Sequence, residues 1–396
     1  MKKISYFLFS IWLSSCAKQD AFLDIKSNKA DVMPSTIEDY QAILNNDVVM
    51  NNWLPALGMI GSDNFYVEYP AWQATSTTQE RNTYIWAKDI YNGEKGFDWQ
   101  MAYQAIGYAN VVLDGIQKIK PTSSSQASLN TLRGAALFFR SFAFYELAQL
   151  FAPPYDAATA AKDAGIPLKT SSSVNELFPR ASVEETYQRI HQDLKEAMGL
   201  LPLTSSYLTQ PSQLAVQALL ARIWLTQGNY ARSLEASDAV LKAYNTLIDY
   251  NNFSAAATIT FPAYPNCVPE VIFYATCNSF GIASYSNLKV DSMLYKSYAA
   301  NDLRKGLFFR NNGATGIAYK GDYNGNVIPS KFSGFATNEM YLIRAESKAR
   351  LGNVADAMTD LNTLLVKRWK TGAFIPLTAA TQTEAITKIL AERRKE

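Results

Sequence analysis

Two segments with the same pattern decide the fold: ALLARIWLTQGNYARSLEASDAVL at residues 218–241 and LIRAESKARLGNVADAMTDLNTLL at residues 342–365. Each reads as an apolar helix, a Gly-Asn turn (Gly228-Asn229 or Gly352-Asn353) and a second helix. Glycine readily adopts the left-handed backbone that ends a helix, and small residues let two helices approach closely. Small or apolar residues recur at matching positions: Ala221 and Ala345, Ala231 and Ala355, Leu234 and Met358. The repeated pattern therefore predicts antiparallel helical hairpins.

Such hairpins resemble tetratricopeptide (TPR) repeats, whose units stack on their neighbours. Residues 132–151 are apolar nearly all round, which predicts a helix buried between others. Ser182-Val183-Glu184-Glu185 is a capping box, in which the Ser and Glu side chains satisfy free backbone amides at a helix start. Four hairpins are expected, at 99–151, 182–227, 230–245 with the preceding helix, and 338–369. The fold class expected is mostly α, a TPR-like helical-hairpin stack with long irregular and short-β insertions.

Two regions interrupt the helical pattern, at residues 50–98 and 246–337. The first is rich in turn residues and aromatic side chains. The second mixes short strand patterns with turns, and Asn324-Gly325 favours a tight hairpin turn within Tyr323–Asn326. Neither region has the character of a separate domain. Both read as insertions laid over the helical stack, and long loops in compact proteins commonly carry function.

The first sixteen residues read as an export leader. Lys2-Lys3 is followed by an apolar run, Ile4 to Leu13, of only ten residues, about half of what a membrane-spanning helix needs. Leu13-Ser14-Ser15-Cys16 resembles a bacterial lipobox, which implies cleavage before Cys16, acylation of Cys16 and firm membrane attachment. An ordinary leader with a chance cysteine at the junction is the alternative.

Composition and charge bound the function. The chain has 396 residues, 48% hydrophobic and 18% charged, as expected of a globular protein. Removing Lys2 and Lys3 with the leader leaves 35 of its 37 basic residues, which equals the 35 acidic ones. A neutral chain without a long basic run is a poor candidate for binding nucleic acid. Cys267 and Cys277 flank a predicted buried strand that would hold them too far apart for a disulfide, so two buried free thiols are favoured over a bond.

Catalytic and metal-binding patterns are weak, so no catalytic residue, metal ligand or cofactor is expected. His191 is the only histidine, and its neighbours on a predicted helix indicate a solvated or hydrogen-bonded structural role. Asp322 to Asn326 begins like a calcium-binding loop, but Ser333 stands where the bidentate glutamate should be, so a turn is favoured. Carboxylate pairs such as Glu184/Glu185 or Asp63/Glu68 could in principle hydrolyse glycosides, although nothing in the sequence fixes their separation.

Aromatic side chains in the two insertions are the main candidates for ligand binding. A sugar ring stacks its C–H face on Trp or Tyr, while its hydroxyl groups bind neighbouring polar side chains. The stretch from Asp63 to Trp72 supplies both kinds, and Trp72 and Tyr66 are the strongest candidates. The candidate set from both insertions is Asp63, Asn64, Tyr66, Tyr69, Trp72, Tyr264 and Tyr285, with Phe280 as a lesser member. The alternative is that these rings anchor the insertions to the stack. Rings on helices are assigned to the core: Trp99, Tyr103, Phe138, Phe139, Trp224 and Trp369. Arg133 and Arg140, on a buried helix, are expected to pair with acidic side chains.

Several strings, in order along the mature chain, resemble the SusD/RagB family. They are Phe22-Leu23-Asp24, the segment from Arg133 to Phe151 running into Pro154-Tyr155, Gly165-Ile166-Pro167-Leu168, Arg180, and Asn338 to Glu346. The resemblance implies a TPR-based protein that sits as a lid on a SusC-like TonB-dependent outer-membrane transporter and binds glycans or, in some members, peptides. Ala17-Lys18-Gln19-Asp20 is similar to the tag that sends such lipoproteins to the cell surface in the Bacteroidetes.

The expected organisation follows from this resemblance. Residues 1–15 are the leader, 16–245 an N-terminal region, and 246–396 a C-terminal region that contains the insertion 246–337. The family pattern normally continues beyond a segment such as Leu390 to Glu396, so either the gene product is truncated or this member is short. The function expected is a surface-exposed outer-membrane lipoprotein that binds nutrients and delivers them to the transporter. The alternative is a lipid-anchored TPR scaffold that binds only proteins; a hydrolase is the third hypothesis.

Overall fold

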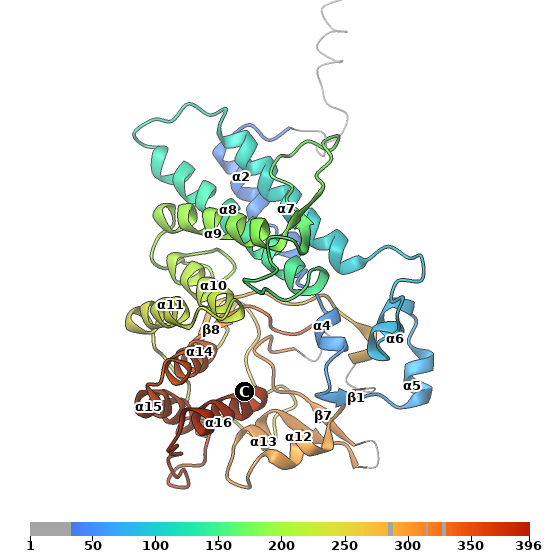
Figure 1. Cartoon of the computed structure of the whole chain (residues 1–396), viewed down its shortest axis with the longest axis vertical. Helices are drawn as coiled ribbons and strands as arrows, with labels where there is room; N and C mark the ends of the chain where they lie inside the picture. Colours follow the sequence, from blue (N-terminus) through green and yellow to red (C-terminus); the bar gives the residue numbers. More distant parts are fainter. Residues whose placement is uncertain (1–32, 284–287, 314–315, 327–329) are drawn as a thin grey trace, which may run out of the picture.

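The protein is described from a computed structural model that covers residues 33–283, 288–313, 316–326 and 330–396. The leader, Cys16 and Tyr285 lie outside the described residues. Helices dominate, and they form a stack that descends one side of the molecule while the two insertions occupy the other (Figure 1). Among the described residues, no helix combines the length and the apolar character needed to cross a bilayer.

Consecutive helices pack closely in three of the four predicted hairpins. The stack comprises α2 (Ile37–Leu44), α7 (Phe97–Ile116), α8 (Gln126–Phe151), α9 (Val183–Leu200), α10 (Gln213–Thr226), α11 (Tyr230–Ala243), α14 (Thr337–Arg350), α15 (Val354–Leu365) and α16 (Gln382–Lys395). Helix α7 packs on α8, α10 on α11, and α14 on α15. Helix α9 touches α10 but packs mainly on α8, and α11 packs on α14, which continues the stack. The mostly α, TPR-like fold is confirmed.

The two Gly-Asn turns adopt the predicted left-handed backbone, but only some of the repeated small residues lie between helices. Gly228 and Gly352 have φ values of +71° and +89°, which a residue with a Cβ atom rarely adopts. Ala221 and Ala345 are fully buried between helices. Ala231 and Ala355 are exposed instead, because each begins the second helix on the side that faces away from the first.

Helix capping follows the predicted chemistry. The Ser182 hydroxyl accepts a hydrogen bond from the Glu185 amide at 3.1 Å, and the Glu185 carboxylate accepts one from the Ser182 amide at 2.7 Å. Ser182 ends the short strand β3 (Arg180–Ser182), which pairs with β2 (Ala164–Pro167). The predicted capping box is confirmed, and it fixes the start of α9.

The first insertion is more helical than expected. Helices α3 (Asp47–Met50), α4 (Leu57–Ile60), α5 (Tyr69–Ala74) and α6 (Thr78–Tyr84) and strand β1 (Phe65–Tyr66) lie within or beside it. These helices are too short for a repeating apolar pattern to be visible in the sequence. Tyr69 and Trp72 therefore stand on a helix, not in an irregular loop.

The second insertion consists of short elements, as predicted. They are the 3₁₀ helices η2 (Tyr250–Asn252) and η3 (Gly281–Ala283), helices α12 (Ser292–Ser297) and α13 (Arg304–Leu307), and strands β4 (Val271–Phe273), β5 (Lys289–Val290), β6 (Phe309–Asn311), β7 (Ile317–Tyr319) and β8 (Phe335–Ala336). The turn at Asp322–Gly325 exists, closed by a 2.9 Å hydrogen bond from the Gly325 amide to the Asp322 carbonyl. The predicted hairpin there is wrong, because β7 pairs with β6 and no described strand follows the turn to pair across it.

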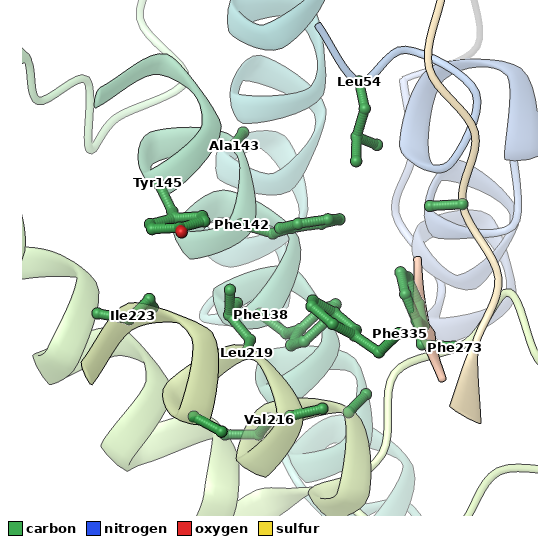
Figure 2. Close-up of a cluster of buried hydrophobic side chains, with 14 of the residues drawn as sticks. Leu54, Phe138, Phe142, Ala143, Tyr145, Val216, Leu219, Ile223, Phe273 and Phe335 are labelled. Carbon is green, nitrogen blue, oxygen red and sulfur yellow. The ribbon is translucent and has the colours of Figure 1, made fainter. Parts of the chain in front are cut away.

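The second insertion is anchored in the helical core. Strands β4 and β8 pair with each other, and their rings pack on α8, as Figure 2 shows. The ring of Phe273 lies 5.1 Å from that of Phe138, and the ring of Phe335 lies 5.3 Å from that of Phe142. All four side chains are completely buried. This packing holds the insertion on the stack, so the surface it carries has a fixed position.

Candidate functional site

The two insertions meet and form one continuous region. Strands β1 and β5 pair in antiparallel register, with Phe65 opposite Val290 and Tyr66 opposite Lys289. The Lys289 ammonium lies 2.5 Å from the Glu68 carboxylate. Glu80 on α6 accepts a hydrogen bond of 2.7 Å from the Ile282 amide. Residues that are far apart in sequence are therefore brought together at the side of the molecule away from the stack (Figure 1).

Three of the candidate rings lie on or beside α5, and they differ in exposure. Tyr66 is 43% exposed and Tyr69 is 67% exposed. Trp72 is half-buried against the core: its ring stacks on that of Tyr69 at 5.6 Å, and its indole N–H donates to the Arg81 carbonyl at 3.0 Å. Trp72 thus supports Tyr69 from behind, and Tyr69 offers the more open face.

Trp86 is a candidate that sequence reasoning did not single out. It is 79% exposed, and its indole N–H donates to the Gly61 carbonyl at 3.1 Å, so the ring is held while its face stays open. Its φ of +54° lies in the left-handed region, which is uncommon for a bulky residue and frequently marks functional sites. No sequence pattern signals this backbone, because Tyr84-Ile85-Trp86 has no glycine or asparagine.

We name Tyr66, Tyr69, Trp72 and Trp86 the aromatic surface. The two polar candidates, Asp63 and Asn64, do not hydrogen-bond within it. The Arg394 guanidinium near the end of α16 donates to Asn64 at 2.9 Å and lies 3.5 Å from the Asp63 carboxylate.

The two described candidates in the second insertion, Tyr264 and Phe280, pack against other apolar side chains. The Tyr264 ring stacks on that of Tyr274 at 4.9 Å, in a second hydrophobic cluster. Phe280 is buried and therefore packs as core. Tyr285, outside the described residues, remains a prediction.

A cavity of about 370 Å³ opens where the two insertions join. Its wall includes Glu80, Phe97 and Asp98 from the first insertion and Asn278 and Phe280 from the second. The Asp98 carboxylate accepts hydrogen bonds from the Ala56 and Leu57 amides and from the Asn278 side chain. Burial raises the pKa of Asp98, and these three hydrogen bonds oppose the rise. Asp98 therefore links the two insertions through these hydrogen bonds.

Two further cavities lie beside α16, where it meets the insertions. The first, of about 280 Å³, lies beside α14, and the second, of about 260 Å³, extends to Asn64. We name them the inner cavities. Their common wall is formed by Phe308, Tyr319, Asp322, Phe332 and Glu396. Asn64 and Phe280 are thus the two described members of the predicted ligand set that line an inner cavity.

The histidine and the two described cysteines, which were candidates for catalysis or metal binding, have structural roles. The His191 ring stacks on Trp224 at 3.8 Å and hydrogen-bonds Gln227 at 2.8 Å, and burial lowers its pKa. This confirms a hydrogen-bonded structural histidine. Cys267 and Cys277 are free thiols, as predicted, although only Cys277 is fully buried.

The predicted arginine pairs are also present. Arg140 donates to Asp193 at 2.7 Å, and Arg133 pairs with Glu196. Both pairs join α8 to α9, so these arginines hold the stack together.

Comparison with known proteins identifies the same fold and family. Residues 21–225 match the sequence profile of the SusD-like family, described as "Starch-binding associating with outer membrane". The chain is 28% identical over 165 residues to "SusD-like protein P2" of Formosa agariphila, a match that covers 41% of this chain and only 30% of that relative.

Several solved structures have a similar fold. A SusD superfamily protein from Bacteroides vulgatus has a TM-score of 0.75 at 19% identity, and the match covers 92% of this chain and 86% of that one. A putative sugar binding protein from the same species has a TM-score of 0.72 at 20% identity, with coverage of 92% and 84%. Surface glycan-binding protein A from Bacteroides uniformis has a TM-score of 0.70 at 15% identity, with coverage of 91% and 85%. Since the family profile spans more than half of the sequence, this chain belongs to the SusD-like (SusD/RagB) family.

Proposed function

We propose that this protein is a lipid-anchored outer-membrane protein that binds glycans at the aromatic surface and delivers them to a SusC-like TonB-dependent transporter. The observation that carries the proposal is a set of solvent-exposed aromatic rings whose positions are held by neighbouring residues. Tyr66, Tyr69 and Trp86 are exposed, although large apolar side chains are usually buried. Trp72, which stacks on Tyr69, donates a hydrogen bond to the Arg81 carbonyl, and Trp86 donates one to the Gly61 carbonyl, so both indole rings are held in place.

The arrangement suits a glycan because each open ring offers an apolar face beside polar groups. Glu68 and Lys289 lie at the β1–β5 junction next to Tyr66, where they can exchange hydrogen bonds with sugar hydroxyls. Rings fixed before binding lose little side-chain entropy when a ligand arrives. The family profile and the neighbouring structures, which include proteins described as sugar-binding, support the ligand class.

The affinity test compares ring deletions with a matched control. Tyr69→Ala and Trp86→Ala should each weaken glycan binding by roughly threefold to tenfold, from the loss of about 0.5–1.5 kcal/mol of ring stacking. Trp72→Ala should also weaken binding, because Tyr69 loses its support. Tyr207→Ala is the control, since the Tyr207 side chain is also largely exposed but stands in the loop before α10. The ligand is first found on a glycan array with the purified chain and then titrated by calorimetry.

The outcome separates the alternatives. If all four variants bind the glycan as tightly as the unmodified protein, the aromatic surface is not the glycan-binding site. Binding of peptides without glycans would change the ligand class, and turnover of the bound oligosaccharide would indicate a hydrolase. A protein that binds neither, yet co-purifies with other proteins, would support the scaffold alternative.

Anchoring and delivery need separate experiments. We propose that Cys16 carries the lipid, so Cys16→Ser should release the protein from the outer membrane, whereas Cys267→Ser should not. Co-purification of a TonB-dependent barrel from native membranes tests the partner. Protease accessibility on intact cells tests surface exposure.

A further inference from the structure

The cavity at the junction of the two insertions, which we name the junction cavity, is lined by two buried amide side chains that each have an unused hydrogen-bonding atom. Gln79 on α6 is 6% exposed and Asn278 is 5% exposed. The Gln79 Nε2 group and the Asn278 Oδ1 atom have no hydrogen-bond partner among the described residues, and both keep solvent-accessible surface. Polar atoms of buried side chains usually have a partner, so these two atoms favour a ligand that enters the cavity.

The orientation of both amides is fixed by their other contacts. The Phe97 backbone amide donates to Gln79 Oε1 at 3.5 Å, which leaves Nε2 as the donor. The Asn278 Nδ2 group donates to the Asp98 carboxylate at 2.9 Å, which leaves Oδ1 as the acceptor. The junction cavity therefore offers a ligand one donor and one acceptor, and neither amide can turn over without losing an existing hydrogen bond.

The wall of the junction cavity also has an apolar part. Leu57, Ile60 and Phe280 supply it. Phe97 adds an aromatic ring that is 52% exposed. A ligand that fits this wall combines a small apolar group with a hydrogen-bond donor and a hydrogen-bond acceptor. An acetamido group has these three parts in its methyl, N–H and C=O groups.

The charges of the wall disfavour an acidic ligand. Glu80, Glu94 and Asp98 supply three carboxylates, against the single ammonium of Lys95. Asp98 already accepts three hydrogen bonds. Like charges repel strongly where solvent is excluded, so sugars that carry carboxylate or sulfate groups are poor ligands for this cavity. A neutral sugar remains.

From these observations we propose that the junction cavity is a selective subsite for the acetamido group of an N-acetylhexosamine. Asn278 Oδ1 accepts the acetamido N–H, Gln79 Nε2 donates to the acetamido carbonyl, and the Phe97 ring packs on the sugar. The volume of about 370 Å³ lies at the lower end of the ~300–1,000 Å³ range of small-molecule sites, which suits one sugar residue. The inference rests on the proposed function for the ligand class, and it adds which sugar is preferred.

The junction cavity adjoins the aromatic surface but shares no residue with it. Ile60 lines the cavity, and the next residue, Gly61, accepts the hydrogen bond that holds Trp86. One oligosaccharide can therefore place an N-acetylhexosamine in the cavity while a neighbouring sugar lies on the exposed Trp86 ring.

Two disaccharides that differ only in their acetamido groups test the proposal. N,N′-diacetylchitobiose carries an acetamido group on each ring where cellobiose carries a hydroxyl group. Titrated into the whole chain by calorimetry, diacetylchitobiose should bind at least about tenfold more tightly than cellobiose, because two hydrogen bonds depend on the acetamido group. In saturation-transfer NMR, the acetamido methyl protons should receive the strongest saturation from the protein.

Gln79→Glu is the sharpest variant. Its carboxylate can still accept from the Phe97 amide, but its second oxygen replaces the donor and repels the acetamido carbonyl. The affinity for diacetylchitobiose should therefore fall to that for cellobiose. Gln192→Glu, at an exposed position on α9, is the matched control and should keep the preference. Urea unfolding verifies the fold of each variant; should Gln79→Glu fail to fold, Phe97→Ala at its exposed position should still weaken diacetylchitobiose binding by roughly threefold to tenfold.

The possible outcomes separate this inference from the proposed function. Equal affinities for the two disaccharides, or a preference that survives Gln79→Glu, would overturn the acetamido subsite and leave the proposed function standing. A preference lost in Tyr69→Ala but kept in Gln79→Glu would assign it to the aromatic surface instead. Equally tight binding of N-acetylalanine amide would mean that the cavity reads peptide amides, against the proposal. If neither disaccharide binds, the inference fails, and the glycan array decides the proposed function by itself.

Discussion

Replacing Glu270 with glutamine should destabilise the protein more than any comparable change at its surface. The Glu270 carboxylate lies directly before β4 and accepts two hydrogen bonds from Arg368, at 2.9 and 3.0 Å. It also accepts from the Ile248 amide at 2.8 Å and the Tyr323 hydroxyl at 2.5 Å. Both charged side chains are 0% exposed. Arg368 follows α15, so this pair joins the stack to the second insertion.

The magnitude follows from what glutamine can keep. Its oxygen can retain one set of contacts, but its NH₂ group then faces either Arg368 or the other donors, and the guanidinium loses its opposite charge in a dry environment. Breaking a buried ion pair by neutralising one partner costs about 3–5 kcal/mol. With an m-value of about 3 kcal/mol/M for urea, the unfolding midpoint should fall by about 1 M or more.

The assay is urea unfolding followed by tryptophan fluorescence, with Glu196→Gln as the matched control. Glu196 pairs with Arg133 at the surface, where the side chains are 41% and 36% exposed. Solvent screens that pair, so its loss should cost less than about 1 kcal/mol. Equal midpoints for Glu270→Gln and Glu196→Gln would refute the view that the buried pair joins the insertion to the stack.

Three further predictions concern the stack. Gly115→Ala should destabilise the protein by about 1–3 kcal/mol, because the added Cβ would lie 2.2 Å from the Tyr40 ring. Gly107→Ala on the same helix is the control: its Cβ meets nothing within 4 Å, so it should stabilise the protein by up to about 1 kcal/mol. Thermal unfolding of the two variants measures the difference. Burial raises the pKa of Glu146 to about 7, above its unfolded value, so its contribution is present at low pH and lost as the pH rises through 7. Wild-type stability should therefore fall relative to Glu146→Gln between pH 5 and 8, by up to about 3 kcal/mol, and a pH-independent difference would contradict this. Ser182→Ala should cost about 1 kcal/mol through the lost helix cap, measured by urea unfolding.

Sequence reasoning worked best where the signal is local. The capping box at Ser182 and the turns at Gly228 and Gly352 depend on residues within one or two helical turns, and all three occur as predicted. It failed where the partner is distant. The Asn324-Gly325 dipeptide predicts a hairpin, yet β7 pairs with β6, which precedes it, and not with a strand after the turn. The left-handed backbone of Trp86 has no local signal, since neither glycine nor asparagine precedes it at residues 84 and 85.

The sequence by itself determined the helical stack, its family and the regions that carry rings, because apolar periodicity, caps and glycine turns act over short stretches of chain. Only the tertiary structure decided which rings are open. The pairing of β1 with β5 joins segments that are far apart in the sequence; in the folded chain Phe280 is buried and Asn64 lines an inner cavity. Exposure depends on what packs on each side chain from elsewhere in the chain, and no local pattern encodes that.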